Sequence, residues 1–120
     1  MVKRTGTTNK ILEDLIRELK KLSTKENVNI WKRVAKDLEK PNRQMRKTNI
    51  FKIDKFTKES EIAIVPGKVL SEGELTKKTT VAAWQFSEKA REKINKKGSA
   101  ISIKELIMIN PKGKKVRIIG

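Results

Sequence analysis

The stretch Thr-Thr-Val-Ala-Ala-Trp-Gln-Phe-Ser-Glu-Lys-Ala, residues 79–90, joins a strand pattern directly to the start of a helix. Residues 79–86 are rich in β-branched and aromatic side chains, which favour a strand. Ser87 follows them and is a residue type that caps the amino end of a helix. This helix is expected to end at Lys96-Lys97-Gly98, because cations suit the helix dipole and glycine suits the carboxyl terminus. A mixed α/β fold is therefore expected.

The chain that follows predicts one more helix and one more strand. Ser102-Ile103-Lys104-Glu105 is a capping box, which opens a short helix through about Ile109. Asn110-Pro111-Lys112-Gly113 is a turn sequence, and residues 116–119 after it are predicted to form the last strand.

Two strands are predicted before the opening stretch. Residues 62–65, Ile-Ala-Ile-Val, form a short apolar run that Pro66-Gly67 ends. Residues 49–53, Asn-Ile-Phe-Lys-Ile, alternate in polarity and are also interpreted as a strand.

The first part of the chain has the periodicity of helices. Residues 9–22 repeat apolar side chains at spacings of three and four, and a second helix is predicted over residues 29–39, until Pro41 ends it. The predicted fold class is α/β: an N-terminal helical extension followed by a small layered α/β core with short strands, in the order α-α-β-β-β-α-α-β. The extension is assigned to residues 1–48 and the core to residues 49–120, as one structural unit.

Charge defines the class of partner. The 120 residues contain 30 Lys and Arg against 14 Asp and Glu, a net charge of +16. Such an excess opposes compaction unless a polyanion neutralises it, and nucleic acid is the commonest such partner. An anionic membrane is the competing partner. It is not favoured, since the chain shows no apolar run of roughly 18 residues, no signal peptide and no lipidation motif. A cytoplasmic protein is expected.

Missing residue types narrow the function further. The chain has no Cys and no His, so it lacks thiol nucleophiles, zinc-finger ligands and the side chain best suited to proton transfer near neutral pH. We therefore expect no catalysis, no metal, no cofactor and no small-molecule substrate. It also has no Tyr, two Trp and three Phe. That is sparse for stacking single-stranded bases, so recognition of structured RNA by its backbone and shape is favoured.

Motifs along nearly the whole chain closely resemble one family. The motifs are Thr8-Asn9 before the first helix, Ile30-Trp31-Lys32-Arg33-Val34-Ala35, Val65-Pro66-Gly67-Lys68-Val69-Leu70, Gly73-Glu74-Leu75, Lys78-Thr79-Thr80-Val81-Ala82-Ala83, Phe86-Ser87-Glu88-Lys89-Ala90, Asn110-Pro111-Lys112-Gly113 and Val116-Arg117-Ile118-Ile119-Gly120. That family is large-subunit ribosomal protein eighteen-e, the archaeal and eukaryotic relative of bacterial large-subunit protein fifteen. The resemblance implies an α/β fold with an N-terminal helical extension. It also implies a structural, non-catalytic role on large-subunit ribosomal RNA, beside neighbouring large-subunit ribosomal proteins. The family tends to have a dense basic run after Pro41, which Asn42, Gln44 and Met45 dilute here.

Basic clusters supply the candidate contacts with RNA. Residues 40–58 hold seven basic residues and one acid, Asp54, and the segment after Pro41 is expected to be a loop whose side chains reach phosphates. The first ten residues form a second cluster. Pro66-Gly67-Lys68 is interpreted as a turn that exposes Lys68. The predicted RNA contacts are Lys3, Arg4, Lys10, Lys40, Arg43, Arg46, Lys47, Lys52, Lys55, Lys68, Lys77, Lys78, Lys112, Lys114, Lys115 and Arg117.

The two tryptophans and two pairs of carboxylates are not predicted to contact RNA. Trp31 and Trp84 are predicted to pack in the core rather than stack on bases. The carboxylate pairs at residues 72 and 74 and at residues 59 and 61 are predicted to be solvated or locally ion-paired.

The alternative function is a basic nucleic-acid-binding module that acts off the ribosome. Duplex DNA is not favoured, since the first helix balances its cations with acids.

Overall fold

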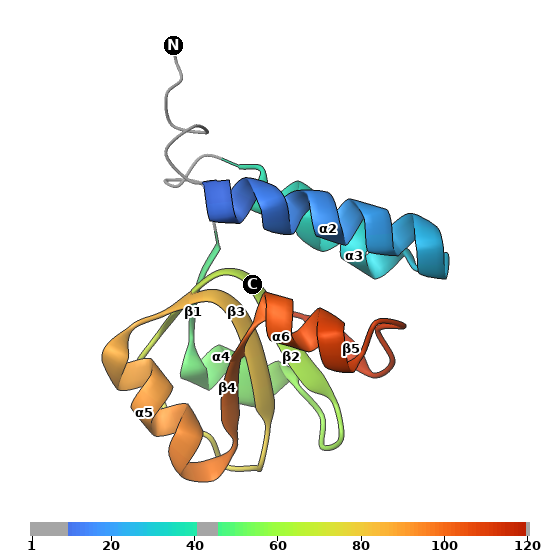
Figure 1. The fold of residues 1–120 in the computed structure, drawn as a ribbon. Coiled ribbons are helices and arrows are strands. Elements are labelled where there is room, and N and C mark those ends of the chain that lie inside the picture. The colour runs from blue at the N-terminus through green and yellow to red at the C-terminus, as the bar shows by residue number, and fades with distance from the viewer. Residues whose placement is uncertain (1–9, 41–45, 120) are drawn as a thin grey trace.

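The computed structural model describes residues 10–40 and 46–119. Within them, helices and strands alternate along most of the chain (Figure 1). The elements are α2 (Lys10–Glu26), α3 (Asn29–Leu38), β1 (Arg46–Asn49), α4 (Ile50–Phe56), β2 (Ile62–Leu70), β3 (Thr80–Phe86), α5 (Glu88–Lys97), β4 (Ser99–Ser102), α6 (Ile103–Ile109) and β5 (Val116–Ile118).

All strands described here run parallel in one sheet. Their order is β1-β2-β3-β4, and β5 also pairs with β2. Because β3 lies along one edge of β2 from Ile62 to Val69, β1 and β5 share the other edge. On that edge β5 pairs with residues 62–64 and β1 with residues 67–70, so the two short strands lie end to end.

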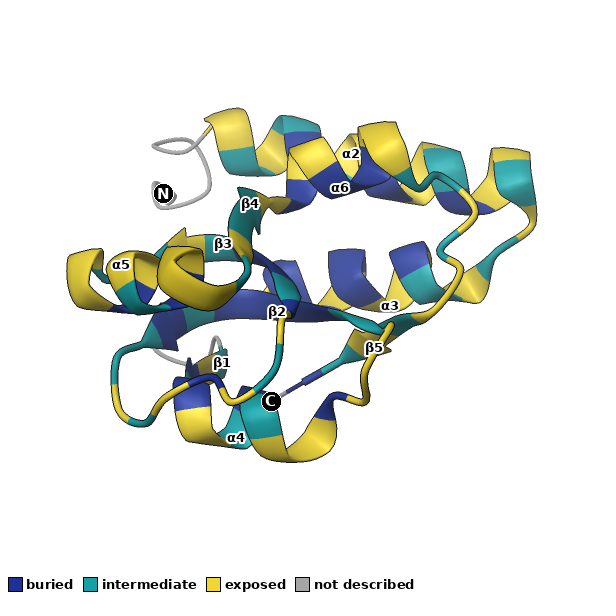
Figure 2. Cartoon of the chain, turned by 90° about the horizontal axis from the view of Figure 1, so that it is seen from below, coloured by how far each residue is buried: buried dark blue, intermediate teal, exposed yellow. Residues whose placement is uncertain are grey.

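Helices cover both faces of the sheet and give a three-layer arrangement. The first hydrophobic cluster joins α2, α3 and α6 to sheet residues such as Ile64 and Ala82. The second joins α4 and α5 to Ala63 and Val65 of β2. Neighbouring strand residues thus point to opposite faces, as the pleat requires. In Figure 1, α2 and α3 lie side by side above the sheet, and Figure 2 shows β2 dark blue over most of its length.

The predicted fold class and all four predicted helices are confirmed. The Ser87 hydroxyl accepts a hydrogen bond from the main-chain N–H of Ala90 at 3.2 Å, which caps α5 as expected. Ser102 and Glu105 form the predicted capping box at the start of α6. The first helix is longer than predicted. It continues to Glu26 and ends where Asn27 adopts a positive φ of 56° and the Val28 N–H donates to the Ser23 carbonyl at 3.0 Å, as in a helix C-cap.

The prediction of a strand over residues 49–53 was wrong. β1 ends at Asn49, and Ile50–Phe56 form α4. Ile50 and Ile53 are both fully buried, a spacing of three that puts them on one helical face, whereas Phe51 between them is exposed. Arg46 and Lys47, which were expected to lie in the loop after Pro41, instead belong to β1.

The interpretation of Pro66-Gly67-Lys68 as a turn was also wrong, since β2 runs through all three residues. The pairing of β2 with β3 shifts register between Val65 and Lys68, a β-bulge that tolerates a proline lacking an N–H. A Cβ atom at residue 67 would collide with the main-chain oxygen of Arg46, so the close approach of β1 requires glycine here. Two strands of the structure were not predicted: β1, in the segment expected to be a loop, and β4.

Candidate nucleic-acid interface

Lysines gather at one end of the sheet because the strands are parallel. The register pairs Ile62 with Thr80 and Val116, and Thr80 with Ser99, so the first residues of β2, β3, β4 and β5 lie side by side. Each of these strands is preceded by lysines. We call them the amino-end lysines: Lys58, Lys77, Lys78, Lys96, Lys97, Lys112, Lys114 and Lys115.

Most amino-end lysines are available to a ligand. Lys77 is half-buried, and its Nζ donates to the main-chain oxygen of Asp54 at 2.7 Å. The other seven are exposed, and within the described ranges none of them forms an ion pair. A phosphate can therefore bind these ammonium groups without breaking an internal contact. Of the eight, Lys96 and Lys97 were in no predicted cluster, since their place beside the others depends on the strand order. Lys58 was part of the predicted basic cluster at residues 40–58 but was not itself among the predicted contacts.

Arg117, a predicted contact, is held by a carboxylate of the same chain. Its Nε and Nη2 donate to the two carboxylate oxygens of Glu61 at 2.8 and 2.9 Å, a bidentate pair. The hydrogen bonds from Arg117, followed by the main-chain N–H of Lys58, lower the pKa of Glu61 from 4.5 to about 2. The same pair raises the pKa of Arg117. The guanidinium therefore keeps one orientation at the edge of the sheet.

A second carboxylate holds two more predicted contacts. Asp37 of α3 is buried, with its carboxylate 3.0 Å from Nη2 of Arg46 and 3.6 Å from Nζ of Lys40. Arg46 is the first residue of β1, and its side chain is 24% exposed. The pair fastens the start of β1 to α3, so Arg46 has a structural task besides any contact with a ligand.

Arg117 and Arg46 meet a third arginine around a cleft of about 620 Å³. We call it the arginine cleft. Its lining residues are Asn29, Ile30, Arg33, Arg46, Glu61, Val116, Arg117 and Ile118. Arg33 is exposed on α3 and was not among the predicted contacts. In the sequence, Arg33 appears only as a cation beside the apolar face of the second helix. Nothing in that pattern indicates that β5 and β1 lie opposite this helix.

The remaining predicted contacts are dispersed. Lys47 is exposed and lies opposite half-buried Lys68 in the register of β1 and β2. On α4, Lys52 is half-buried, and Lys55 is exposed with its Nζ 5.5 Å from the ring centre of Phe56. Lys10 is exposed at the start of α2. Lys3, Arg4 and Arg43 lie outside the described residues.

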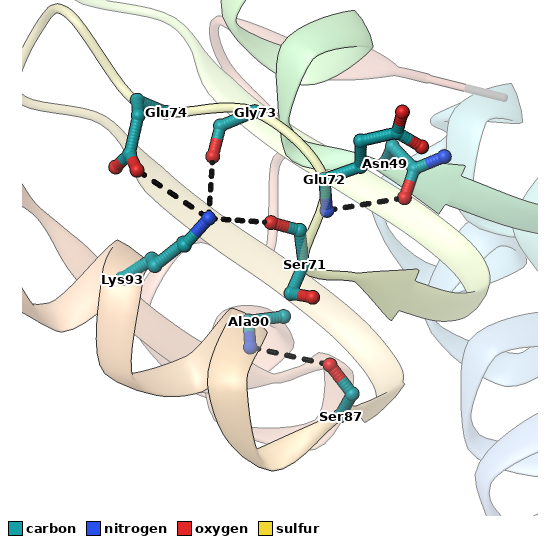
Figure 3. A network of polar contacts seen from close by, with 8 residues as sticks. All are labelled: Asn49, Ser71, Glu72, Gly73, Glu74, Ser87, Ala90 and Lys93. Atoms are coloured by element: carbon teal, nitrogen blue, oxygen red, sulfur yellow. Dashed lines mark hydrogen bonds and ion pairs between the residues drawn. The ribbon is translucent and has the colours of Figure 1, made fainter.

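Not every lysine in the described residues is free for a ligand. Lys93 of α5 donates from Nζ to the main-chain oxygens of Ser71 and Gly73, at 2.9 and 3.1 Å, and lies 3.3 Å from the Glu74 carboxylate (Figure 3). It thereby fastens the loop after β2 to α5. The local ion pairing predicted for the carboxylates is confirmed for Glu74 and Glu61.

Trp31 packs in the core as predicted. It is fully buried, and its indole N–H donates to the main-chain oxygen of Pro111 at 2.6 Å, which ties α3 to the loop after α6. Trp84 is half-buried and packs against the same hydrophobic cluster. Because Trp31 is fully buried, it has no face open for stacking on a base.

Within residues 10–40 and 46–119, no group of three or more acidic side chains is placed to hold a metal ion. No helix in these ranges is long and apolar enough to cross a membrane.

Comparisons with known proteins match this chain to one family over most of its length. The sequence model of the family described as ribosomal protein 60S L18 and 50S L18e matches residues 2–120. The chain is 43% identical to the large ribosomal subunit protein eL18 of Methanopyrus kandleri, covering 96% of this chain and 95% of that protein. It is 46% identical to the protein of the same name from Sulfurisphaera tokodaii, covering 84% and 82%. Identity to that of Methanococcus maripaludis is 43%, covering 99% and 100%.

Proposed function

The chain belongs to the family of ribosomal proteins 60S L18 and 50S L18e, and on that premise we propose that it is a structural constituent of the large ribosomal subunit that binds large-subunit ribosomal RNA. The family is one of ribosomal proteins and not of enzymes. The proposed binding uses phosphate and shape contacts, with little reading of base sequence. Its proposed location is the ribosome in the cytoplasm.

The amino-end lysines are the observation that carries this proposal. They place seven exposed ammonium groups, from four separate segments, at one end of a rigid sheet. A lysine is a mobile point charge, which attracts phosphate without demanding one fixed geometry. Displaced counterions then supply much of the binding free energy, so affinity falls steeply with salt. An end surface of this kind fits a folded RNA that presents several phosphates at once.

The helices and the sheet are proposed to act as one body. α2 and α3 share a hydrophobic cluster with β2, β3 and α6, and α3 is tied to β1 through Asp37 and Arg46. We propose that residues 1–48 and residues 49–120 contact RNA and neighbouring large-subunit proteins as a single unit. Lys3, Arg4, Lys10 and Arg43 are proposed as further contacts with RNA.

Sedimentation of source-cell lysate through sucrose gradients at low and at high salt tests the proposal. The expected result is migration with the large subunit, retained through a moderate salt wash. Recovery at the top of the gradient, or together with DNA, would instead favour the basic module that acts off the ribosome. Comparable affinity of the purified protein for random duplex DNA and for ribosomal RNA at moderate salt would favour the same alternative.

A further inference from the structure

The arginine cleft forms where two strands end against each other. β5 pairs with β2 up to Ile64, and β1 begins its pairing at Gly67. Between these points β2 has Val65 and Pro66, and a proline has no N–H to offer a neighbouring strand. The first residues of α3, Asn29 and Ile30, complete the lining. The cleft therefore follows from the topology of the sheet and the place of α3 beside it.

The charges around the cleft favour an anion. Three guanidinium groups line it against one carboxylate, that of Glu61. Glu61 occupies Nε and Nη2 of Arg117, which leaves the Nη1 edge for a ligand, and Arg33 has no ion-pair partner within the described residues. Arg offers a planar fork that matches two oxygens of a phosphate.

The amino end of α3 adds to this preference. Its N-cap residue, Val28, provides no side-chain hydrogen bond, and the first turn contains no acidic residue. The free N–H groups of a first turn carry partial positive charge and attract anions. Because Asn29 and Ile30 of this turn line the cleft, helix and arginines act on the same space.

The size and the apolar lining indicate more than a phosphate ion. The cleft of about 620 Å³ falls within the range of sites for small organic ligands. Ile30, Val116 and Ile118 line it and are each half-buried, so they offer apolar surface to a ligand. Its lining, taken from the described residues, contains no aromatic side chain, which disfavours selection among bases by stacking.

We propose that the arginine cleft receives one unstacked nucleotide of an RNA, whatever its base. Its phosphate binds Arg33, Arg117 and the first turn of α3, and its sugar and base lie against Ile30, Val116 and Ile118. The proposal deepens the function above and rests on it for the identity of the polymer. The amino-end lysines grip the backbone of structured RNA, whereas the cleft fixes one nucleotide and hence the register of the protein on that RNA.

The test is a titration of ¹⁵N-labelled protein followed by NMR, with adenosine monophosphate, adenosine and inorganic phosphate as separate probes. The monophosphate is expected to shift the amide signals of Asn29, Ile30 and Ile118 at millimolar concentration. Adenosine is expected to leave them unchanged, and inorganic phosphate to bind more weakly than the monophosphate. Equal affinity for phosphate and the monophosphate, or shifts spread over all basic loops, would overturn the proposal.

Two matched variants test whether the monophosphate binds at the arginine cleft. Arg33→Gln removes a cleft cation, and Lys32→Gln removes the neighbouring cation of the same helix, which is exposed and does not line the cleft. Arg33→Gln is expected to weaken monophosphate binding by about tenfold, as for the loss of a charge-assisted hydrogen bond. Lys32→Gln is expected to change it by less than about twofold. Equal losses in the two variants would mean unspecific attraction and would overturn the cleft as a site.

A second measurement separates this proposal from the function on which it rests. Both variants are compared with the unchanged protein for binding to large-subunit ribosomal RNA and to random duplex DNA. If ribosomal RNA is preferred by all three proteins while Arg33→Gln and Lys32→Gln bind it equally, the function stands and the cleft proposal fails. If none of them prefers ribosomal RNA, the function itself fails. A selective loss in Arg33→Gln supports both.

Discussion

The amino-end lysines and the arginine cleft are both basic, but they hold their charges in opposite ways. Seven of the eight lysines are exposed and have no ion pair within the described residues. In the cleft, Arg117 is bound by Glu61 and Arg46 by Asp37. The lysines lie together because parallel strands begin at one edge, whereas two of the three cleft arginines, Arg117 and Arg46, are oriented by the carboxylates of Glu61 and Asp37.

The difference explains why one chain uses both residue types. An ammonium group on a flexible stem accepts many phosphate positions, so a set of them gives affinity with little geometric demand. A guanidinium already fixed by a carboxylate loses little further freedom when it binds, so it contributes to orientation. We infer that the lysines set how strongly the protein binds RNA and that the cleft sets where. Four changes can break or sharpen this contrast.

The largest effect is expected for Trp31→Ala, which removes the buried side chain that anchors α3, the helix whose first turn lines the cleft. The variant removes a fully buried indole and its 2.6 Å hydrogen bond to Pro111. The free energy of unfolding should fall by about 3–5 kcal/mol, as measured by chemical denaturation. The matched variant Trp84→Ala removes a half-buried indole, so its loss should be clearly smaller. Equal losses would show that α3 is not anchored at Trp31.

The next effect is expected from removing charge at the other region. Substituting Lys58, Lys78, Lys97 and Lys114 together by Gln should weaken binding to ribosomal RNA on the order of a hundredfold at moderate salt. The slope of log affinity against log salt should become shallower by about 3, because each phosphate contact contributes slightly less than one unit. Stability should be unchanged, because these side chains are exposed.

The control for this variant keeps the same net charge. Lys21, Lys25, Lys36 and Lys104 are exposed on α2, α3 and α6, away from the starts of the strands. Substituting these four by Gln should change the salt slope much less. A similar change in the two quadruple variants would mean that RNA senses only the total charge, and the amino-end lysines would lose their special role.

Features that depend on neighbours in the chain could be predicted from the sequence, whereas features that depend on the pairing of distant segments could not. Ser87 and the Ser102–Glu105 capping box were predicted correctly because a cap depends on neighbours in the chain. α4 was not predicted, because five residues are too few to separate a strand pattern from a helical one, and only the burial of both Ile50 and Ile53 identifies the helical face. β4 was missed because its four residues become a strand only by pairing with β3.

The residues of the candidate site divide in the same way: clusters that are continuous in the sequence were predicted, and residues that only the fold brings together were not. Lysine clusters before strands are visible in the sequence, so Lys77, Lys78, Lys112, Lys114 and Lys115 were predicted as contacts. Lys96 and Lys97 were interpreted as partners of a helix dipole, and only the parallel order of the strands places them beside the others. Arg33 was missed because the cleft exists only where β5 and β1 meet along β2.

A smaller effect is expected for Asp37→Asn, which loosens the cleft without removing any basic residue. Asn keeps the shape of the side chain but loses the ion pair with half-buried Arg46. The free energy of unfolding should fall by about 2 kcal/mol, measured by chemical denaturation. Asp14→Asn is the matched control, because Asp14 pairs with Arg17 on the exposed face of α2 at a similar distance of 3.2 Å. That pair should contribute less than about 0.5 kcal/mol.

The smallest effect, and the most specific, is the dependence on pH introduced by Glu61. Arg117 lowers the pKa of Glu61 in the folded protein from 4.5 to about 2. A carboxyl group with a depressed pKa stabilises the fold above pH 4.5, and the contribution disappears as the pH falls toward 2. Glu61→Gln should therefore be less stable than the unchanged protein near neutral pH, and the difference should shrink over that window. Thermal unfolding at several pH values measures it.

Glu59→Gln provides the control, since it removes the same charge from an exposed position in the same loop. The difference between the two variants should close as Glu61 becomes protonated. If Glu61→Gln follows the pH dependence of the unchanged protein throughout, the bidentate pair does not hold Arg117 in solution. Arg117 would then be as mobile as the lysines, and the distinction between affinity at the strand ends and orientation at the cleft would rest on Arg46 and Asp37 alone.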